Sequence, residues 1–310
     1  MSKKVNREKR KGKIMGKVCK ICGSKKISIE YDGIIRDGAT TSKTKNNVKM
    51  YKCNECGVIW HDSMKEIDTY YVSEEYRKEL EHTSKINDFY AMHDFECFDK
   101  FSYTGTECFR NKIVADIGCG GGGFLDFLSG VAEKVVGIEP SAAYRAEMDK
   151  RGIETYAYAK EALEGLRGQI DVVVSFDVIE HVESPIQFMK EIYDLLGEGG
   201  QAIVGTPTDA PIMRELLGSV YEENLLFSTQ HLWVLNENSL GYICRQAGFN
   251  EVDIRYKQRY GLGNMISWLL EKKAGVKREY SFVTSTLDKV WKSELEANKK
   301  SDYILAYVKK

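Results

Sequence analysis

The sequence predicts an α/β protein, in which a doubly wound, largely parallel sheet follows a small metal-binding domain. From Ile113 onward, short apolar strands alternate with helical segments, which is typical of a parallel sheet with helices on both faces. Near the N-terminus, four of the eight cysteines form two close pairs, which indicates a metal site rather than disulfides. At 310 residues, the chain has room for about two domains, one of them with a substantial core.

Composition and hydropathy indicate a soluble globular protein. Hydrophobic residues make up 43% and charged residues 29% of the chain, which is too apolar for general disorder. No apolar run approaches the ~18 residues that span a bilayer, and the N-terminal region lacks the apolar core of a signal peptide. We therefore expect a cytoplasmic protein without a membrane span.

Positive charge is concentrated at the N-terminus. Residues 1–20 carry nine Lys or Arg and one acid, a charge of +8, whereas the whole chain has a net charge of −1. We expect residues 1–18 to form a basic, disordered tail, although such a tail can also hold nucleic acid or an anionic membrane. Met15 is an alternative start of the natural protein, and the residues before it are then not part of that protein.

Residues 19–64 are predicted to form a zinc ribbon. Cys19 and Cys22 lie in CKICG, and Cys53 and Cys56 lie in CNECG. Each C-x-x-C-G motif places two thiolates on a tight turn, and two such turns complete a tetrahedral four-cysteine site for Zn²⁺. A structural role is expected for this metal, because so small a domain has few large apolar side chains and metal binding supplies folding energy.

Residues 65–110 are predicted to form a mostly helical connector between the ribbon and the main domain. This segment is acidic and rich in aromatic residues at mixed spacing. Tyr90 and His93, in FYAMHDFE, lie three residues apart and therefore on one face of a helix. Both side chains are candidates to cap a bound cofactor, and packing alone is the alternative role.

Residues 111–310 are predicted to form the main α/β domain. Its apolar runs predict strands, and the segments between them predict helices. The expected strands are 113–118, 134–139, 154–159, 171–176, 201–206, 251–257 and 302–308, and later helices are expected at 265–273 and 284–299. A segment at about 206–235 is expected to cover the acceptor as a lid, and about 262–300 is expected to be a helical insertion.

The first predicted strand of this domain runs into a glycine-rich turn, DIGCGGGGF. Gly118, Gly120 and Gly123 satisfy G-x-G-x-x-G, in which glycines permit the turn and let a ligand approach the backbone where a helix starts. Glu139 ends the second predicted strand, 19 residues after Gly120, where a carboxylate can accept both ribose hydroxyls. NAD and S-adenosylmethionine both carry an adenosine ribose, so this spacing fits either cofactor.

The wider pattern separates the two cofactors. VADIGCGGGGFLD, VVGIEPS, DVVVSFDVIEHVESP and an L-x-x-G-G turn before the fifth strand resemble class I S-adenosylmethionine-dependent methyltransferases over about residues 110–250. The resemblance implies a Rossmann-like seven-stranded sheet with an antiparallel last strand, which DYILAYV completes, and S-adenosylhomocysteine as the product. We find no nicotinamide-binding and hydride-acceptor region of the kind that a dehydrogenase needs.

The same resemblance implies a set of cofactor-binding residues. In this family a G-x-G-x-G loop and the acid before it surround the methionine part, and an acid after the second strand binds the ribose. The matching positions are Asp116, Gly118, Gly120 and Gly122 around the methionine part, Glu139 followed by Pro140 at the ribose, Tyr158 with Ala159 beside the adenine, and Phe176 with Asp177 at the end of the fourth strand.

Two histidines are candidates for the general base that an acceptor with a proton to lose requires. Both are predicted near the carboxyl ends of strands, where open α/β sheets bind their ligands. His181 follows the fourth strand in DVIEHV, where positioning the cofactor or stabilising the loop is its alternative role. His231 lies in FSTQHLWV on the predicted lid, with helix capping or packing beside Trp233 as the alternative.

The order of the two predicted domains bears on the acceptor. A four-cysteine ribbon ahead of a methyltransferase domain is similar to the arrangement in sugar methyltransferases that act on nucleotide-linked sugars, including C-methylating ones. We therefore expect a carbohydrate acceptor, a nucleotide-linked sugar or a glycan precursor, with O-methylation favoured over C-methylation. The alternative is an RNA- or protein-directed methyltransferase that binds a macromolecule through the ribbon and the basic tail. The intact glycine loop argues against a non-catalytic scaffold, and the sequence does not predict the oligomeric state.

Overall fold

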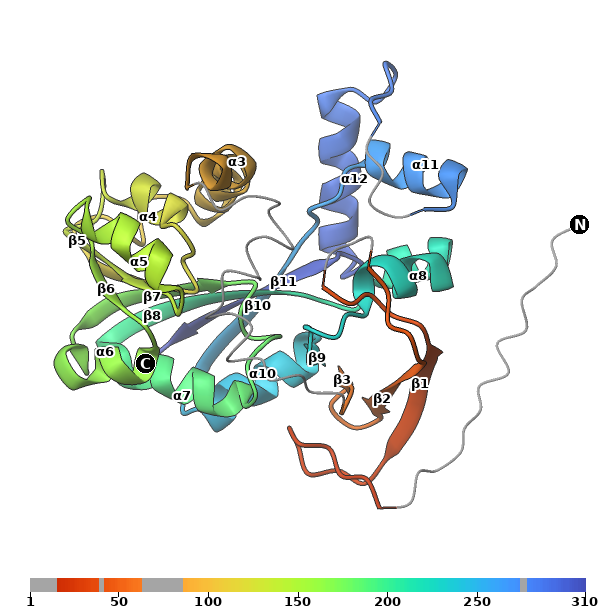
Figure 1. Ribbon diagram of the computed structural model, residues 1–310, viewed down its shortest axis with the longest axis horizontal. Helices are drawn as coiled ribbons and strands as arrows, with labels where there is room; N and C mark the ends of the chain where they lie inside the picture. The colour runs from red at the N-terminus through yellow and green to blue at the C-terminus, as the bar shows by residue number, and fades with distance from the viewer. Residues whose placement is uncertain (1–15, 39–41, 63–85, 274–277) are drawn as a thin grey trace, which may run out of the picture.

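The fold consists of two sheets with helices packed around the larger one (Figure 1). A computed structural model of the protein describes residues 16–38, 42–62, 86–273 and 278–310. The larger sheet has seven strands in the order β10-β11-β8-β7-β4-β5-β6, and the smaller has four in the order β1-β2-β3-β9. Most of the predicted basic tail and the first part of the predicted connector lie outside the described residues.

The seven-stranded sheet is parallel except for β11, which is antiparallel to both of its neighbours. Its strands are β4 (Ile113–Ile117), β5 (Lys134–Ile138), β6 (Glu154–Tyr156), β7 (Ile170–Phe176), β8 (Leu196–Pro207), β10 (Glu251–Lys257) and β11 (Tyr303–Lys309). The predicted fold class, a doubly wound seven-stranded sheet with an antiparallel last strand, is confirmed.

Helices cover both faces of this sheet (Figure 1). The central strand β7 is a continuous apolar run because neither of its faces meets water, and Val172, Val173 and Val174 are at most 1% exposed. One face packs against α6 (Ala159–Leu166), α7 (Pro185–Leu195) and α10 (Glu237–Gln246), and the other against α3 (Ile86–Thr104), α4 (Gly123–Leu128) and α5 (Ala142–Asp149).

Two predicted strands differ from the structure in their limits. The strand predicted at 154–159 ends at Tyr156, because Ala159 already begins α6. The strand predicted to begin at 201 begins at Leu196. Its pairing with β7 shifts register across residues 197–200, where Gly199 has a φ of 73°, so the predicted glycine turn is a bulge within β8.

The ribbon shares its sheet with the main domain. Its strands β1 (Ile27–Gly33), β2 (Val48–Cys53) and β3 (Ile59–Trp60) are joined by β9 (Trp233–Val234), which comes from the predicted lid segment. Within the pairing of β3 and β9, Trp60 lies opposite Trp233. One continuous core contains Trp60 of the ribbon and Leu232 of the main domain, so the two parts pack as a single body.

The predicted lid and the predicted insertion are helical and pack together. The lid contains α8 (Pro211–Leu217), α9 (Ser219–Tyr221) and the π-helix η1 (Glu222–Leu226), and the insertion contains α11 (Leu262–Glu271) and α12 (Ser285–Ala297). Met213, Met265 and Trp268 from these helices share a core with Ile35 and Met50 of the ribbon. Within the described ranges, no helix combines the length and the apolar character needed to cross a membrane.

Candidate active site

The glycine loop between β4 and α4 forms one wall of the candidate site. Gly118, Gly120 and Gly122 have φ values of 80°, 54° and 81°, a conformation that only glycine adopts readily. A Cβ at Gly118 would also collide with the side chain of Val178, so this position excludes larger residues for two reasons. The loop therefore brings bare backbone to the carboxyl end of β4, directly before the first turn of α4.

Glu139 lies next to this loop, at the end of β5. Its Oε2 accepts a hydrogen bond from the Gly120 N–H at 3.0 Å, and its Oε1 accepts one from the Ser141 N–H at 2.9 Å. Arg145 holds the same turn by donating to the carbonyl oxygens of Glu139 and Pro140 at 2.6 and 2.7 Å. A carboxylate has about four acceptor sites, more than these two backbone bonds use, which suits it to ribose hydroxyls.

Charged side chains surround the carboxyl ends of β4 and β7, with Asp116 buried and Lys100 and Asp177 partly exposed. Burial raises the pKa of Asp116 to about 7, with the Glu139 charge acting in the same direction and the Lys100 charge in the opposite one. The Lys100 ammonium lies 3.4 Å from an Asp177 carboxylate oxygen. Burial by itself lowers the pKa of Lys100, but the charges of Asp177 and Glu96 raise it above its ordinary value. The carboxylates at this edge of the sheet therefore favour the positively charged form of Lys100.

The side chains of Asp177 and Phe176 lie in different surroundings at the end of β7. Asp177 has a φ of 59° and donates its backbone N–H to the Gly205 carbonyl at 3.0 Å, which turns it out of the strand. Its carboxylate also lies 3.3 Å from the Arg259 guanidinium. Phe176 is instead 6% exposed and packs edge-on against Phe124, so it belongs to the core beneath the site.

Helix α3 lies over the glycine loop. The Tyr90 hydroxyl donates to the Gly121 carbonyl at 3.0 Å. The Phe89 ring also packs on the loop, 2.9 Å from where a Cβ of Gly120 would be, and it contacts the His93 ring at a tilt of 37° with ring centroids 4.5 Å apart. Sequence reasoning singled out Tyr90 and His93 and missed Phe89, because helical spacing alone does not say which face turns toward the loop.

The two residues expected beside an adenine lie at the start of α6. Tyr158 is the N-terminal cap residue of this helix and is 43% exposed. Ala159 is its first residue and is 5% exposed. They follow β6, whose Tyr156 carbonyl accepts a hydrogen bond from the Glu139 N–H at 2.9 Å, so they lie one strand away from the predicted ribose carboxylate.

His181 and His231 meet across the candidate acceptor side, with ring centroids 4.8 Å apart and the rings nearly perpendicular. Glu180 joins them and is 1% exposed, with its Oε2 accepting from the Thr206 hydroxyl at 2.9 Å. Burial lowers the pKa of His181 to about 4 and that of His231 well below its usual range, and burial raises the pKa of Glu180 to about 8. Sequence reasoning missed Glu180, although it stands beside His181 in DVIEHV.

The ribbon holds the segment that carries His231. Thr229 donates its backbone N–H to the Arg36 carbonyl at 3.0 Å, and its hydroxyl donates to Asp37 at 2.7 Å. Trp233 lies in β9 beside β3 and donates its indole N–H to the Val182 carbonyl at 2.8 Å. His231 therefore lies between two attachments to the ribbon, and its position depends on residues nearly 200 positions away in the sequence.

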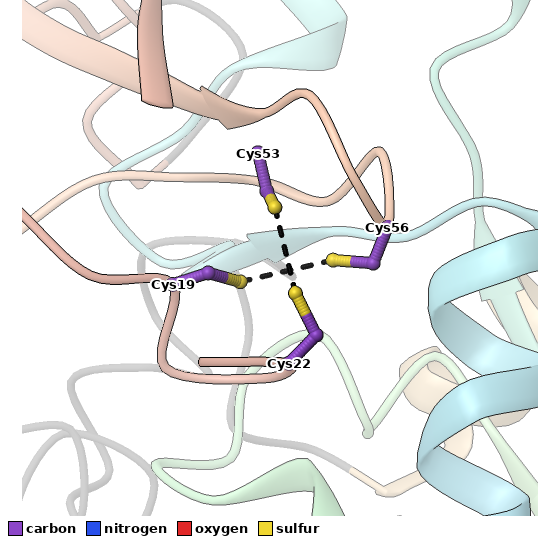
Figure 2. Close-up of side chains that lie close together, drawn as sticks. All are labelled: Cys19, Cys22, Cys53 and Cys56. Carbon is purple, nitrogen blue, oxygen red and sulfur yellow. Dashed lines mark hydrogen bonds between the residues drawn. The ribbon is translucent and has the colours of Figure 1, made fainter. Parts of the chain in front are cut away.

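The four cysteines of the two C-x-x-C-G motifs converge (Figure 2). The Cys19 and Cys56 sulfurs are 3.7 Å apart, and the Cys22 and Cys53 sulfurs are 3.5 Å apart. Four thiolates with bonds of about 2.3 Å to a tetrahedral zinc ion lie about 3.8 Å from one another. The hydrogen bond with the Cys56 thiol lowers the pKa of Cys19 to about 5, which favours a thiolate at neutral pH.

Comparisons with known proteins agree with this geometry. A family profile described as a methyltransferase domain matches residues 90–254. The ubiquinone biosynthesis O-methyltransferase of Ruegeria pomeroyi is 31% identical over 175 residues, which is 53% of this chain and 69% of that protein. The protein of the same name from Roseobacter denitrificans is 29% identical over 191 residues, 58% of this chain and 75% of that protein.

Solved methyltransferase structures also align with the chain. One is an S-adenosylmethionine-dependent methyltransferase from Archaeoglobus fulgidus, at 16% identity and a TM-score of 0.48, over 71% of this chain and 94% of that one. Another, from Thermotoga maritima, is described as a possible histamine N-methyltransferase and has 22% identity and a TM-score of 0.47, over 72% of this chain and 93% of that one.

The sheet order, the glycine loop and the carboxylate after β5 are the features of a Rossmann-like enzyme domain of the class I methyltransferase type. The chain belongs to the methyltransferase-domain family, and it is an S-adenosylmethionine-dependent methyltransferase.

Cofactor binding is expected to weaken at low pH. As the pH falls through about 7, Asp116 takes up a proton, and its neutral form no longer attracts the positive charges of S-adenosylmethionine. Affinity should therefore rise between about pH 6 and 7.5, with a proton released on binding, as calorimetry in buffers of different ionisation enthalpy measures. Asp116→Asn should remove most of this pH dependence, and an equal slope in both proteins would contradict the assignment.

The hydrogen bond between Thr229 and Asp37 is expected to support turnover. Asp37→Ala and Thr229→Val each remove it and should lower kcat by about 5- to 10-fold, with cofactor affinity unchanged within about twofold. The double variant should be no worse than either single variant, because both lose the same interaction. Asp37→Asn keeps an acceptor oxygen and should restore most of the turnover.

Steady-state kinetics of these variants, with Ser28→Ala on the exposed side of the ribbon as a control, make this measurement. Losses that add in the double variant, or an equal loss of cofactor affinity, would show that the hydrogen bond does not act on the His231 segment.

Proposed function

We propose that the protein transfers the methyl group of S-adenosylmethionine to a hydroxyl oxygen of a small-molecule acceptor. The observation that carries the proposal is the meeting of Glu180, His181 and His231 in one cluster, in which Glu180 is buried and both histidines are partly exposed. The cluster follows the carboxyl ends of β7 and β8, where open α/β sheets bind their ligands. Relatives that are named O-methyltransferases support oxygen as the acceptor atom.

The cofactor supplies an electrophilic methyl group on a sulfonium and a neutral thioether leaving group when it is bound. The glycine loop lets its methionine part approach the backbone, and Glu139 accepts from its ribose hydroxyls. The carboxylates of Asp116 and Asp177 offset its positive charge. In this proposal Tyr90 and His93 cover the cofactor from α3, and Tyr158 and Ala159 lie beside its adenine.

The two imidazoles are the proposed hydrogen-bond acceptors for the hydroxyl group of the methyl acceptor. Because burial lowers both of their pKa values, His181 and His231 are neutral near pH 7 and each offers a ring-nitrogen lone pair. We propose that His231, with His181 beside it, orients the hydroxyl and assists the loss of its proton. The main contribution of the protein is alignment of the hydroxyl oxygen with the methyl carbon and sulfur, because the displacement is in line.

The four cysteines are proposed to hold a structural zinc ion. Their sulfur separations fit a tetrahedral thiolate site, and the protein around them offers a thiolate at Cys19. The ion would lock the ends of the ribbon strands together, and through β3 it would support β9. Its role in this proposal is mechanical, because four thiolates leave no open position for a substrate.

The acceptor class is tested with methyl-labelled S-adenosylmethionine. The full chain is incubated with phenols, free sugars and nucleotide-linked sugars, and separately with RNA and protein from a cell extract. We expect label in a small hydroxyl compound, as a methyl ether that mass spectrometry identifies. Labelled nucleotide-sugar would support the carbohydrate acceptor expected from the sequence, which the relatives do not support. Label only in RNA or protein would overturn the proposal.

Two variants separate cofactor binding from acceptor chemistry. His231→Ala should lower kcat by about 100-fold or more and leave affinity for the cofactor within about twofold. Glu139→Ala should weaken cofactor binding instead, because it removes the predicted ribose acceptor and a bond to the loop. Wild-type turnover in His231→Ala would contradict its assignment.

Metal analysis tests the structural zinc. The full chain should carry one zinc ion in the ribbon, and Cys53→Ser should lose it and unfold at lower temperature, because metal binding contributes folding energy. Cys108→Ser is the matched control, since Cys108 lies outside the four-cysteine cluster. Retention of zinc by Cys53→Ser would show that these thiols do not hold it.

A further inference from the structure

The cluster of Glu180, His181 and His231 also has the composition of a metal site. One ligand atom from each residue lies within 4.8 Å of the other two. Two imidazoles with one carboxylate are a ligand set for divalent transition metals, and three protein ligands leave open positions for water or a substrate oxygen. The cysteine cluster differs in kind, because four soft thiolates close the coordination shell.

Hydrogen bonds outside the cluster orient its members. The Nδ1 of His181 lies 2.9 Å from the Gln230 carbonyl, which can only accept, so Nδ1 carries the proton. The lone pair of His181 is then on Nε2, which lies 3.9 Å from Oε1 of Glu180. The other oxygen of Glu180 accepts from the Thr206 hydroxyl at 2.9 Å. Metal-binding histidines and carboxylates characteristically have such second hydrogen bonds, which fix the ring and the carboxylate.

One carboxylate oxygen of Glu180, Oε1, is buried without a hydrogen-bond partner in the described part of the chain. This oxygen lies 3.9 Å from Nε2 of His181. Burying a carboxylate oxygen in this way is costly unless a proton or a cation compensates it, and a divalent ion bound between Glu180 and His181 supplies that compensation.

We infer that Glu180, His181 and His231 bind one divalent transition-metal ion, and that the acceptor hydroxyl coordinates to this ion during methyl transfer. The inference rests on the proposed function and deepens it, because it specifies how the hydroxyl is activated. The ion takes the ring lone pair of His231, so this imidazole orients the hydroxyl through the ion and the proton of the hydroxyl goes to solvent. Bonds of about 2.1 Å to such an ion bring neighbouring ligand atoms to about 3.0–3.4 Å from each other. The three side chains therefore need to move together by about 1 Å, within the reach of small χ rotations.

Coordination changes the chemistry of the acceptor in a balanced way. A hydroxyl on a divalent ion has a lowered pKa, as water does, so its proton leaves to solvent at neutral pH. The oxygen lone pair forms the O–CH₃ bond while the C–S bond breaks and its electron pair stays on sulfur. One acceptor hydroxyl and one S-adenosylmethionine thus give one methyl ether, one S-adenosylhomocysteine and one proton.

Manganese is the probe that separates this site from the ribbon. Mn²⁺ binds imidazole and carboxylate ligands and competes poorly with zinc for thiolates, so it can be added to the full chain with zinc in the ribbon. The electron paramagnetic resonance signal of free Mn²⁺ falls as the ion binds, and this loss measures binding directly. We expect one Mn²⁺ per chain in the wild type, with affinity at least about tenfold lower in Glu180→Gln, His181→Ala and His231→Ala.

Three further variants serve as controls. Glu183→Gln replaces an exposed carboxylate three positions after Glu180 and should bind Mn²⁺ like the wild type. Thr206→Val should weaken Mn²⁺ binding by about 10-fold, because it removes the hydrogen bond that positions Glu180, and Thr206→Ser should restore it. Calorimetry with S-adenosylmethionine on every variant reports whether the main domain is folded.

Two results would overturn the inference. One is a wild type that binds S-adenosylmethionine but neither Mn²⁺ nor any zinc beyond the ribbon ion. The other is full methyl transfer in excess chelator while metal analysis still finds the ribbon zinc. Stoichiometric Mn²⁺ binding that the three ligand variants lose, without methyl transfer to any hydroxyl compound, would reject the proposed acceptor and leave the metal site supported.

Discussion

The acceptor side depends on the pairing of β3 with β9. These strands are only two residues long, yet they join the ribbon to the lid segment, and the bridge between Arg36 and Ser228 attaches the same segment at a second point. His231 lies between the two attachments and therefore meets His181, which the chain places 50 positions earlier. A backbone hydrogen bond from Trp233 to the Glu180 carbonyl ties this segment to the loop after β7.

The cofactor side depends on the balance between two carboxylates and two cations. Asp116 and Asp177 lie at the ends of adjacent parallel strands, and Lys100 and Arg259 bring positive charge to them from elements outside those strands. Asp177 is partly exposed and is compensated by ion pairs with both cations, whereas Asp116 is buried and has only the attraction of Lys100, so burial still raises its pKa to about 7. Asp177 also keeps a positive φ, and a strained backbone of this kind is characteristic of functional sites.

The parts of the site that sequence reasoning identified are those determined by local spacing. Gly118, Gly120 and Gly122 need positive φ to turn from strand to helix, and that need is visible as glycine in the sequence. Glu139 follows from the spacing of two consecutive parallel strands, whose carboxyl ends share one edge. Phe89 carries no such signal, because an aromatic residue on a helix looks the same whether it packs on a loop or on the core.

The fold class, the glycine loop and the two cysteine pairs can be read from the sequence, because each rests on periodicity or spacing within a short stretch. The place of the ribbon on the acceptor side and the contact of Glu180 with His181 and His231 emerge from the folded chain alone. These contacts link residues far apart in the chain through a two-residue strand pairing, and strand pairing across such distances has no local sequence signature. The chemistry of the acceptor site is therefore a property of how the two parts of the chain pack together.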